Sequence, residues 1–135
     1  MQKLVFGLIT GLLLSATTAF AFDHEHKTWT MMLKKYQDAK GFVRYKAWKG
    51  DQGPLNAYLK TLEGVSFATY KSWTPLQKQA FLINAYNAFT VKLILKEYPV
   101  KSIKDIGGVF TKPWSVEFFS LLGGKIKSLD PIEHE

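Results

Sequence analysis

The feature that most constrains the fold is a long helix predicted between Thr74 and Pro99. Thr74 is a favoured N-cap, Pro75 suits the first helical position, and Gln77 completes a capping box. Pro99 ends the helix, because proline disfavours helical geometry in the residue before it. A helix from Pro75 to about Glu97 would be roughly 34 Å long at 1.5 Å per residue, enough to cross a small domain.

The middle of this helix is strongly apolar. Between Ala80 and Leu95 the polar residues are Asn84, Asn87, Thr90 and Lys92. A transmembrane span is not expected, because the apolar run is short and contains a lysine. At about 100° per residue, Lys78, Lys92 and Lys96 fall on one edge, which predicts the solvent-facing side. We therefore expect a central helix that is buried on nearly every other side.

Two asparagines interrupt the apolar run. Asn87 lies about 180° from the lysine edge and Asn84 roughly 120° from it, so both amides are expected to face inward. A buried amide without a partner costs about 1–3 kcal/mol, so each should form hydrogen bonds. Under one interpretation the amides clamp neighbouring loops. Under the other they line a ligand-binding or catalytic pocket.

The N-terminus predicts export. Lys3 precedes an apolar core over residues 4–14, and Ala19-Phe20-Ala21 is typical of a signal-peptide cleavage site. We expect residues 1–21 to be a signal peptide and residues 22–135 to be one domain, located in the periplasm or secreted. A lipoprotein anchor is excluded because no cysteine follows the core. An uncleaved anchor helix is the alternative.

Composition agrees with a single globular domain. The hydrophobic fraction of 47% and the aromatic fraction of 15% are too high for a disordered chain. The chain has no cysteine, which excludes disulfides and thiol chemistry within it. No internal repeat or domain linker is visible.

The charge is basic but carries no specific nucleic-acid signal. Removing Lys3 leaves 17 basic residues against 11 acidic ones, a formal charge of +6, and Arg44 is the single arginine. Phosphate and base recognition rely on the planar arginine fork, which this chain hardly uses. A solvated lysine surface is one interpretation. The other is loose attraction to an acidic envelope polymer or an anionic lipid.

Shorter patterns predict the remaining elements: helices over residues 23–36 and 55–62, an extended segment over 42–48, and a helical turn over 102–105. Residues 114–122 and 125–129 flank Gly123-Gly124, which is a β-hairpin signal. The predicted fold class is therefore α+β: a helix-rich single domain with a long buried central helix and a small antiparallel hairpin.

The last residues contain a helix-start signal. Asp130 is a favoured N-cap, Pro131 suits the first helical position, and Glu133 follows as an acidic residue of the first turn. The sequence ends two residues later, at Glu135. Since one turn cannot repay the cost of nucleation, we expect this signal to have no structural use here. The expectation is a domain that is incomplete at its C-terminus, and the alternative is a frayed tail.

Several strings together resemble exported bacterial members of the domain-of-unknown-function family numbered 547. The most specific are Ala80-Phe-Leu-Ile-Asn-Ala-Tyr-Asn-Ala88 and Ile132-Glu-His134, and the others are Phe22-Asp-His24, Trp29, Leu33-Lys-Lys-Tyr36, Val43 to Trp48, Leu55 to Leu62, Tyr98 to Ile103 and Pro113-Trp114. The resemblance runs from Phe22 to the end of the chain. It implies no settled activity. It also implies that relatives continue into a second half containing cysteines.

The resemblance suggests a leading function and two alternatives. The leading interpretation is an uncharacterised exported domain, truncated and inactive. The first alternative is a complete periplasmic envelope-binding module with a basic surface. The second is a thiol-type hydrolase or transferase activity, confined to full-length relatives. The ligand and any cofactor are left unknown.

Four residues are candidates for a pocket: Asn84, Asn87, Glu133 and His134. The resemblance marks them as characteristic of the family. His134 could meet an asparagine amide across the interior. Adjacent helical residues point roughly 100° apart, so Glu133 cannot simply orient His134. A structural role for Glu133 at the helix start is the alternative.

The N-terminal histidines predict a metal site. If cleavage follows Ala21, the free amine of Phe22, two backbone amides and the His24 imidazole could bind Cu(II) or Ni(II) in a square plane. Asp23 and His26 lie close enough in sequence to modify that site. The alternative is that Asp23 caps the first helix and the histidines face solvent.

Overall fold

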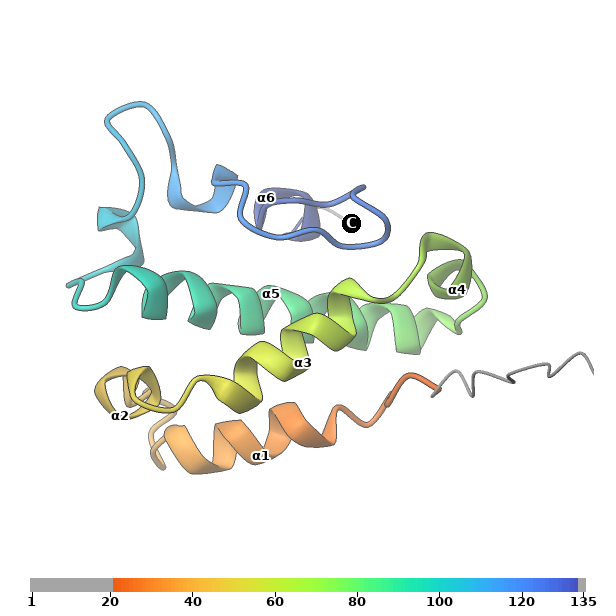
Figure 1. The fold of residues 1–135 in the computed structure, drawn as a ribbon, viewed down its shortest axis with the longest axis horizontal. Helices are drawn as coiled ribbons and strands as arrows, with labels where there is room; N and C mark the ends of the chain where they lie inside the picture. Colours follow the sequence, from red (N-terminus) through yellow and green to blue (C-terminus); the bar gives the residue numbers. More distant parts are fainter. Residues whose placement is uncertain (1–20, 134–135) are drawn as a thin grey trace, which may run out of the picture.

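The computed structural model describes residues 21–133, and its regular structure is helical throughout (Figure 1). The helices are α1 (Lys27–Tyr36), α2 (Tyr45–Lys49), α3 (Gly53–Glu63), α4 (Phe67–Lys71), α5 (Pro75–Glu97) and α6 (Asp130–Glu133), with 3-10 turns η1 (Ile103–Asp105) and η2 (Pro113–Ser115). Residues 21–133 contain no β-strand, only isolated antiparallel bridges at Gln37–Val43 and Leu121–Ile126. The α+β prediction is therefore wrong, and the fold is all-α.

Helix α5 is the central element. Its N-terminus has the predicted capping box: the Gln77 amide donates to Thr74 Oγ1, and the Thr74 amide donates to Gln77 Oε1. Helices α2 and α3 contact α5, α1 packs on α3, and α6 contacts α5 from the other side (Figure 1). The helices described between residues 21 and 133 include none that is long and apolar enough to span a membrane.

Stacked aromatic rings join α1, α2 and α3. The Trp29 ring of α1 stacks on Tyr58 of α3 at 5.8 Å between centroids, and Tyr36 stacks on Trp48 of α2 at 4.7 Å. The extended segment predicted over residues 42–48 is wrong, because its second half is helix α2. Helical spacing turns Tyr45 and Trp48 toward one side, where Trp48 is fully buried and Tyr45 is half-buried.

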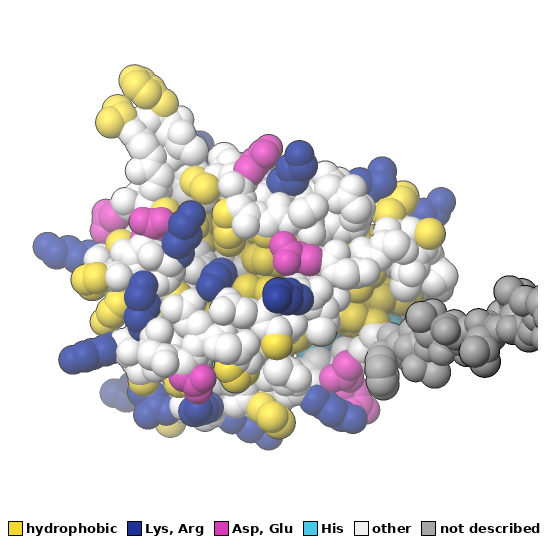
Figure 2. Space-filling view, viewed as in Figure 1, with side chains coloured by type: hydrophobic (Ala, Val, Ile, Leu, Met, Phe, Trp, Pro, Cys, Tyr) yellow, Lys and Arg dark blue, Asp and Glu magenta, His cyan; other side chains and the backbone are white. Residues whose placement is uncertain are grey.

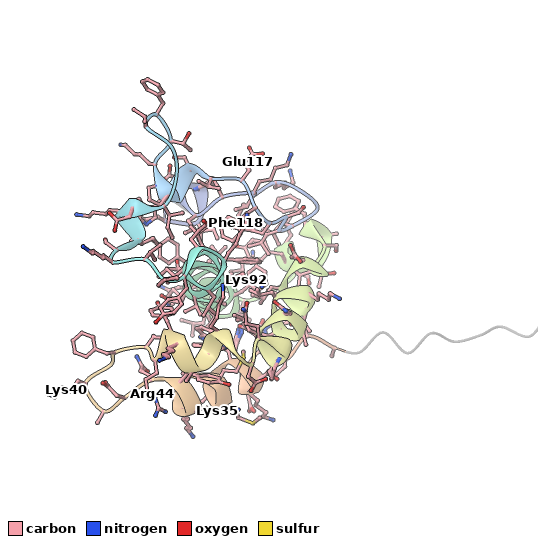
Figure 3. The ribbon with its side chains drawn as sticks, turned by 60° about the vertical axis from the view of Figure 1, so that its left-hand side comes forward. Lys35, Lys40, Arg44, Lys92, Glu117 and Phe118 are labelled. Atoms are coloured by element: carbon pink, nitrogen blue, oxygen red, sulfur yellow. The ribbon has the colours of Figure 1, made fainter. Side chains whose placement is uncertain are left out.

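The predicted hairpin is also wrong. A strand would send successive side chains to opposite faces, but Phe118 and Phe119 both contact Phe89 of α5, at 6.0 Å and 3.9 Å between ring centroids. The next hydrophobic pair, Leu121 and Leu122, is buried at both positions. Because consecutive residues serve the core, the segment cannot keep strand alternation, and it follows an irregular path over α5. Figure 3 shows Phe118 directed inward.

Candidate functional site

An open groove of about 870 Å³ runs along the N-terminal half of α5. We call it the α5 groove, and its lining residues are Tyr70, Pro75, Leu76, Lys78, Gln79, Leu82, Ile83, Tyr86, Asn87, Ile132 and Glu133. Most of these side chains come from α5 itself, and the end of α4 and the short helix α6 supply the rest. The groove is thus a partly covered helix face.

One face of α5 that lines the groove is exposed to solvent. Leu76, Ile83 and Asn87 are spaced by seven and four residues, so they share one face of α5. Leu76 is 77% exposed and Ile83 is 52% exposed. The prediction of a helix buried except at its lysine edge is therefore wrong on this side, where apolar side chains meet solvent.

The lysine edge is instead partly covered by other helices. Lys92 is half-buried, and its Nζ atom donates to Gln52 Oε1 at 3.0 Å and to Asn56 Oδ1 at 2.8 Å, which ties α5 to α3. Figure 3 shows Lys92 directed toward α3. Burial lowers the pKa of Lys92, and the nearby Lys49 lowers it further. A lysine stem can cover apolar surface while its ammonium keeps polar partners, so a lysine edge can pack against a neighbour.

The two asparagines lie differently from the prediction. Asn87 is exposed in the α5 groove, where its Nδ2 atom donates to the Ile83 carbonyl at 3.0 Å. This hydrogen bond stays within the helix. Within residues 21–133 the amide oxygen of Asn87 has no hydrogen-bond partner. Asn84 is half-buried and does not line the groove. The inward placement predicted for Asn87 is therefore wrong.

Helix α6 forms the far wall of the groove. The helix-start signal is confirmed, since α6 begins at Asp130, and the Asp130 carboxylate accepts a hydrogen bond from Ser115 Oγ at 2.5 Å. Ile132 is buried and lines the groove together with Glu133. The expectation that this turn has no structural use is wrong, because it covers part of α5. His134 lies outside the described residues.

Aromatic side chains flank the groove, and no site role was predicted for them from the sequence. Lys78 Nζ lies 5.6 Å from the centre of the Tyr70 ring at one end. Toward the other end, Trp114 Nε1 donates to the Tyr86 hydroxyl at 3.1 Å, which ties the irregular segment after α5 to the helix. The available signal was the apolar stripe of Leu76 and Ile83, which lies away from the lysines on a helical projection.

The predicted metal-site residues each have a different structural role. Asp23 accepts hydrogen bonds from the amides of Glu25 and Lys27, at 3.0 Å and 2.9 Å, so it supports the start of α1. His26 is buried against Tyr58, and the His24 ring contacts Trp73 edge-on at 4.6 Å. In residues 21–133, no three His, Cys, Asp or Glu side chains gather as a metal site. The site that uses a free Phe22 amine stays a prediction.

Comparison with known families identifies this part of the chain. Residues 70–135 match the model of DUF547, a family described as a protein of unknown function. The chain belongs to the DUF547 family over this part of its length. Every residue lining the α5 groove falls within the DUF547 match, which begins at Tyr70. No curated protein and no solved structure matches the chain. The resemblance over residues 22–69 stays a prediction.

The groove is lined mainly by apolar side chains. Its lining is largely aliphatic and aromatic, and its charged residues are Lys78 and Glu133. The described lining residues include no serine, threonine, cysteine or histidine. These side chains can bury an apolar surface and pair with charges of either sign.

Proposed function

We propose that this protein is an exported DUF547 domain that binds a polypeptide helix in the α5 groove. The observation that carries the proposal is the stripe of Leu76 and Ile83, two apolar side chains of α5 that stay in solvent. Contiguous exposed apolar surface with a polar rim is typical of interaction sites. The groove spans residues 75–87 of α5, a length of about 18 Å, or roughly three turns of a partner helix.

A helix fits the groove better than a small molecule does. Small-molecule sites enclose most of their ligand, whereas the apolar residues here lie along an open face. An amphipathic helix instead lays one apolar stripe into such a groove and keeps its other face in water. Lys78 and Glu133 would then pair with an acidic and a basic residue of the bound helix, which fixes its direction.

A designed peptide can test this binding. The probe is an amphipathic helix of about three to four turns, with leucines on one face, a glutamate at one end and a lysine at the other. We expect it to bind the purified protein, and a scrambled peptide of equal composition to bind at least about tenfold more weakly. Equal binding of the two peptides would contradict the proposal. Preferential binding of dodecanoate would indicate an acyl-chain site instead.

Two substitutions can show whether the peptide binds in the α5 groove. Ile83→Glu should weaken peptide binding by about tenfold or more, because one fully buried aliphatic side chain is worth roughly that much. The matched control is Met31→Glu, which changes an exposed apolar residue on α1, away from the groove. The control should bind like the unaltered protein. Equal losses in both variants would place the peptide elsewhere.

Export is the second part of the proposal. Its support is the apolar core over residues 4–14 followed by Ala19-Phe20-Ala21, and residues 1–20 lie outside the described range. Expression of the full chain in a bacterium should yield a periplasmic product that begins at Phe22. Intact mass measurement of that product is the test. A protein that keeps residues 1–21 would contradict signal-peptide cleavage.

A further inference from the structure

The loop between η1 and η2 projects from the body of the molecule and ends in two apolar side chains. Val109 is 94% exposed and Phe110 is 100% exposed. Figure 2 shows this projection at the upper left, with hydrophobic atoms at its end. We call these two residues the Val109–Phe110 tip. A fully exposed phenylalanine at the end of a projecting loop can reach a partner that the rest of the surface cannot touch.

The base of the loop is anchored. Ile106 and Pro113 are buried on either side of it, and the Thr111 amide donates to the Gly108 carbonyl at 3.2 Å. Gly107 has a φ of 110°, and a Cβ atom there would lie 2.3 Å from the Thr111 carbonyl oxygen. Glycine is required where the backbone approaches this closely. The fold therefore holds the tip outward on a defined turn.

The segment that carries the tip contains three lysines. Lys101, Lys104 and Lys112 are all exposed, and the one acidic residue between residues 98 and 116 is Asp105. The Asp105 carboxylate accepts a hydrogen bond from the Ser102 amide at 3.0 Å, within the capping box of η1. The segment that carries the tip is therefore net positive.

Two acidic residues lie below the tip, with Lys104 and Lys112, around the hollow beneath the loop: Asp130 and Glu133. Both belong to α6, and Asp130 accepts a hydrogen bond from Ser115. Val109 and Phe110 line the same hollow. Over residues 98–116, which carry the tip, three lysines outweigh the one aspartate.

We propose that the Val109–Phe110 tip inserts into the surface of an anionic phospholipid bilayer, with Lys101, Lys104 and Lys112 against the headgroups. Apolar side chains flanked by lysines match the two layers of such a surface, an acyl boundary beneath negative charge. A projecting tip fits a flat partner, whereas a groove on the partner would be needed to accept it in a protein complex. The inference rests on this loop and not on the α5 groove.

The position of the tip can be measured directly, because the chain contains no cysteine. A single cysteine introduced by Phe110→Cys carries the fluorophore NBD, and Phe42→Cys, at an exposed phenylalanine elsewhere, is the matched control. With vesicles of phosphatidylglycerol and phosphatidylcholine in equal parts, NBD emission should rise and shift to the blue at position 110 and stay unchanged at position 42. Emission typical of water at position 110 would overturn the proposal, and would leave a protein pocket as the partner of the tip.

Binding of the full chain to the same vesicles by co-sedimentation tests the side chains. Phe110→Ser should weaken the binding by about tenfold, and Phe42→Ser should leave it unchanged. Lys104→Gln combined with Lys112→Gln should weaken it by on the order of tenfold, and the exposed pair Lys46→Gln and Lys60→Gln should have a smaller effect. If the tip variants bind as tightly as the unaltered protein, the proposal is wrong. Failure of the peptide test on the α5 groove would not affect this result.

Discussion

His26 and Tyr58 are joined by a hydrogen bond of 2.7 Å between the imidazole Nδ1 atom and the phenol hydroxyl. The pair links the N-cap of α1 to the middle of α3. The other ring nitrogen, Nε2, is buried and has no hydrogen-bond partner within residues 21–133. Protonation would place an N–H on both nitrogens, and one of them would then be buried without an acceptor.

This arrangement predicts that stability falls in mild acid. Burial lowers the pKa of His26 from its ordinary value of 6.5, the carboxylate of Asp23 opposes that shift, and His24 adds to it. His26 therefore binds a proton more readily in the unfolded chain than in the folded chain. As a result, the free energy of unfolding decreases as the pH falls below 6.5. Urea unfolding at about pH 7.5 and about pH 5.5 measures this, and His26→Gln should reduce the difference. An equal decrease in His26→Gln would assign the effect to other groups.

Removing the hydroxyl of Tyr58 should destabilise the fold. Tyr58→Phe leaves a second buried nitrogen of His26 without a partner, at an expected cost of about 1–3 kcal/mol in the free energy of unfolding. Tyr45→Phe is the matched control, because Tyr45 is half-buried and its hydroxyl forms no hydrogen bond within residues 21–133. The control should change stability by less than about 0.5 kcal/mol. Equal effects in urea unfolding would show that the hydrogen bond adds nothing.

One substitution at two positions of α5 separates its open face from its packed face. Leu93 is buried, and Leu93→Ala should lower the free energy of unfolding by about 2–5 kcal/mol. Leu76 is exposed in the α5 groove, and Leu76→Ala should change it by less than about 0.5 kcal/mol. Thermal unfolding of both variants gives the comparison. A large loss at Leu76 would mean that the groove is closed in solution.

The anchored loop predicts a contrast between adjacent glycines. At Gly107 an alanine Cβ would collide with the Thr111 carbonyl oxygen in a left-handed backbone region, so Gly107→Ala should cost about 1–3 kcal/mol. At Gly108 a Cβ atom would meet nothing within 4 Å, so Gly108→Ala should be nearly neutral. Urea unfolding of the two variants measures the difference. Similar stabilities would indicate that the loop rearranges freely.

Local signals predicted the bounds of α5 well, whereas α1 begins at Lys27 and not at the predicted Asp23. The Thr74–Gln77 capping box and the stop at Pro99 depend on neighbours in the chain, and both give the observed bounds of α5. The same holds for the helix ended by Gly64 and for the turn at Ser102, which has its own capping box. These elements are fixed by interactions within a few residues, so the sequence contains the information.

The features that were predicted wrongly depend on contacts between residues far apart in the sequence. Lys92 is polar, yet Gln52 at the N-cap of α3 and Asn56 within α3 supply its partners, so the edge predicted to face solvent forms a helix contact. Phe118 and Phe119 both face Phe89, which removes strand alternation from a segment with a good turn signal. For the groove, the sequence pointed to Asn87 and Glu133 but not to the apolar stripe between Leu76 and Ile83, because composition alone does not show which face of a helix lacks a neighbour.

The tie between Trp114 and Tyr86 has a dynamic consequence. Side chains such as Trp114 and Phe119 hold the segment after α5, but it lacks the continuous backbone ladder of a helix or sheet. Its amide protons should exchange with deuterated water far sooner than those of α5, although Leu121 and Leu129 are fully buried. The covering layer can therefore open and reclose as a sub-global unit while the helix beneath it remains folded.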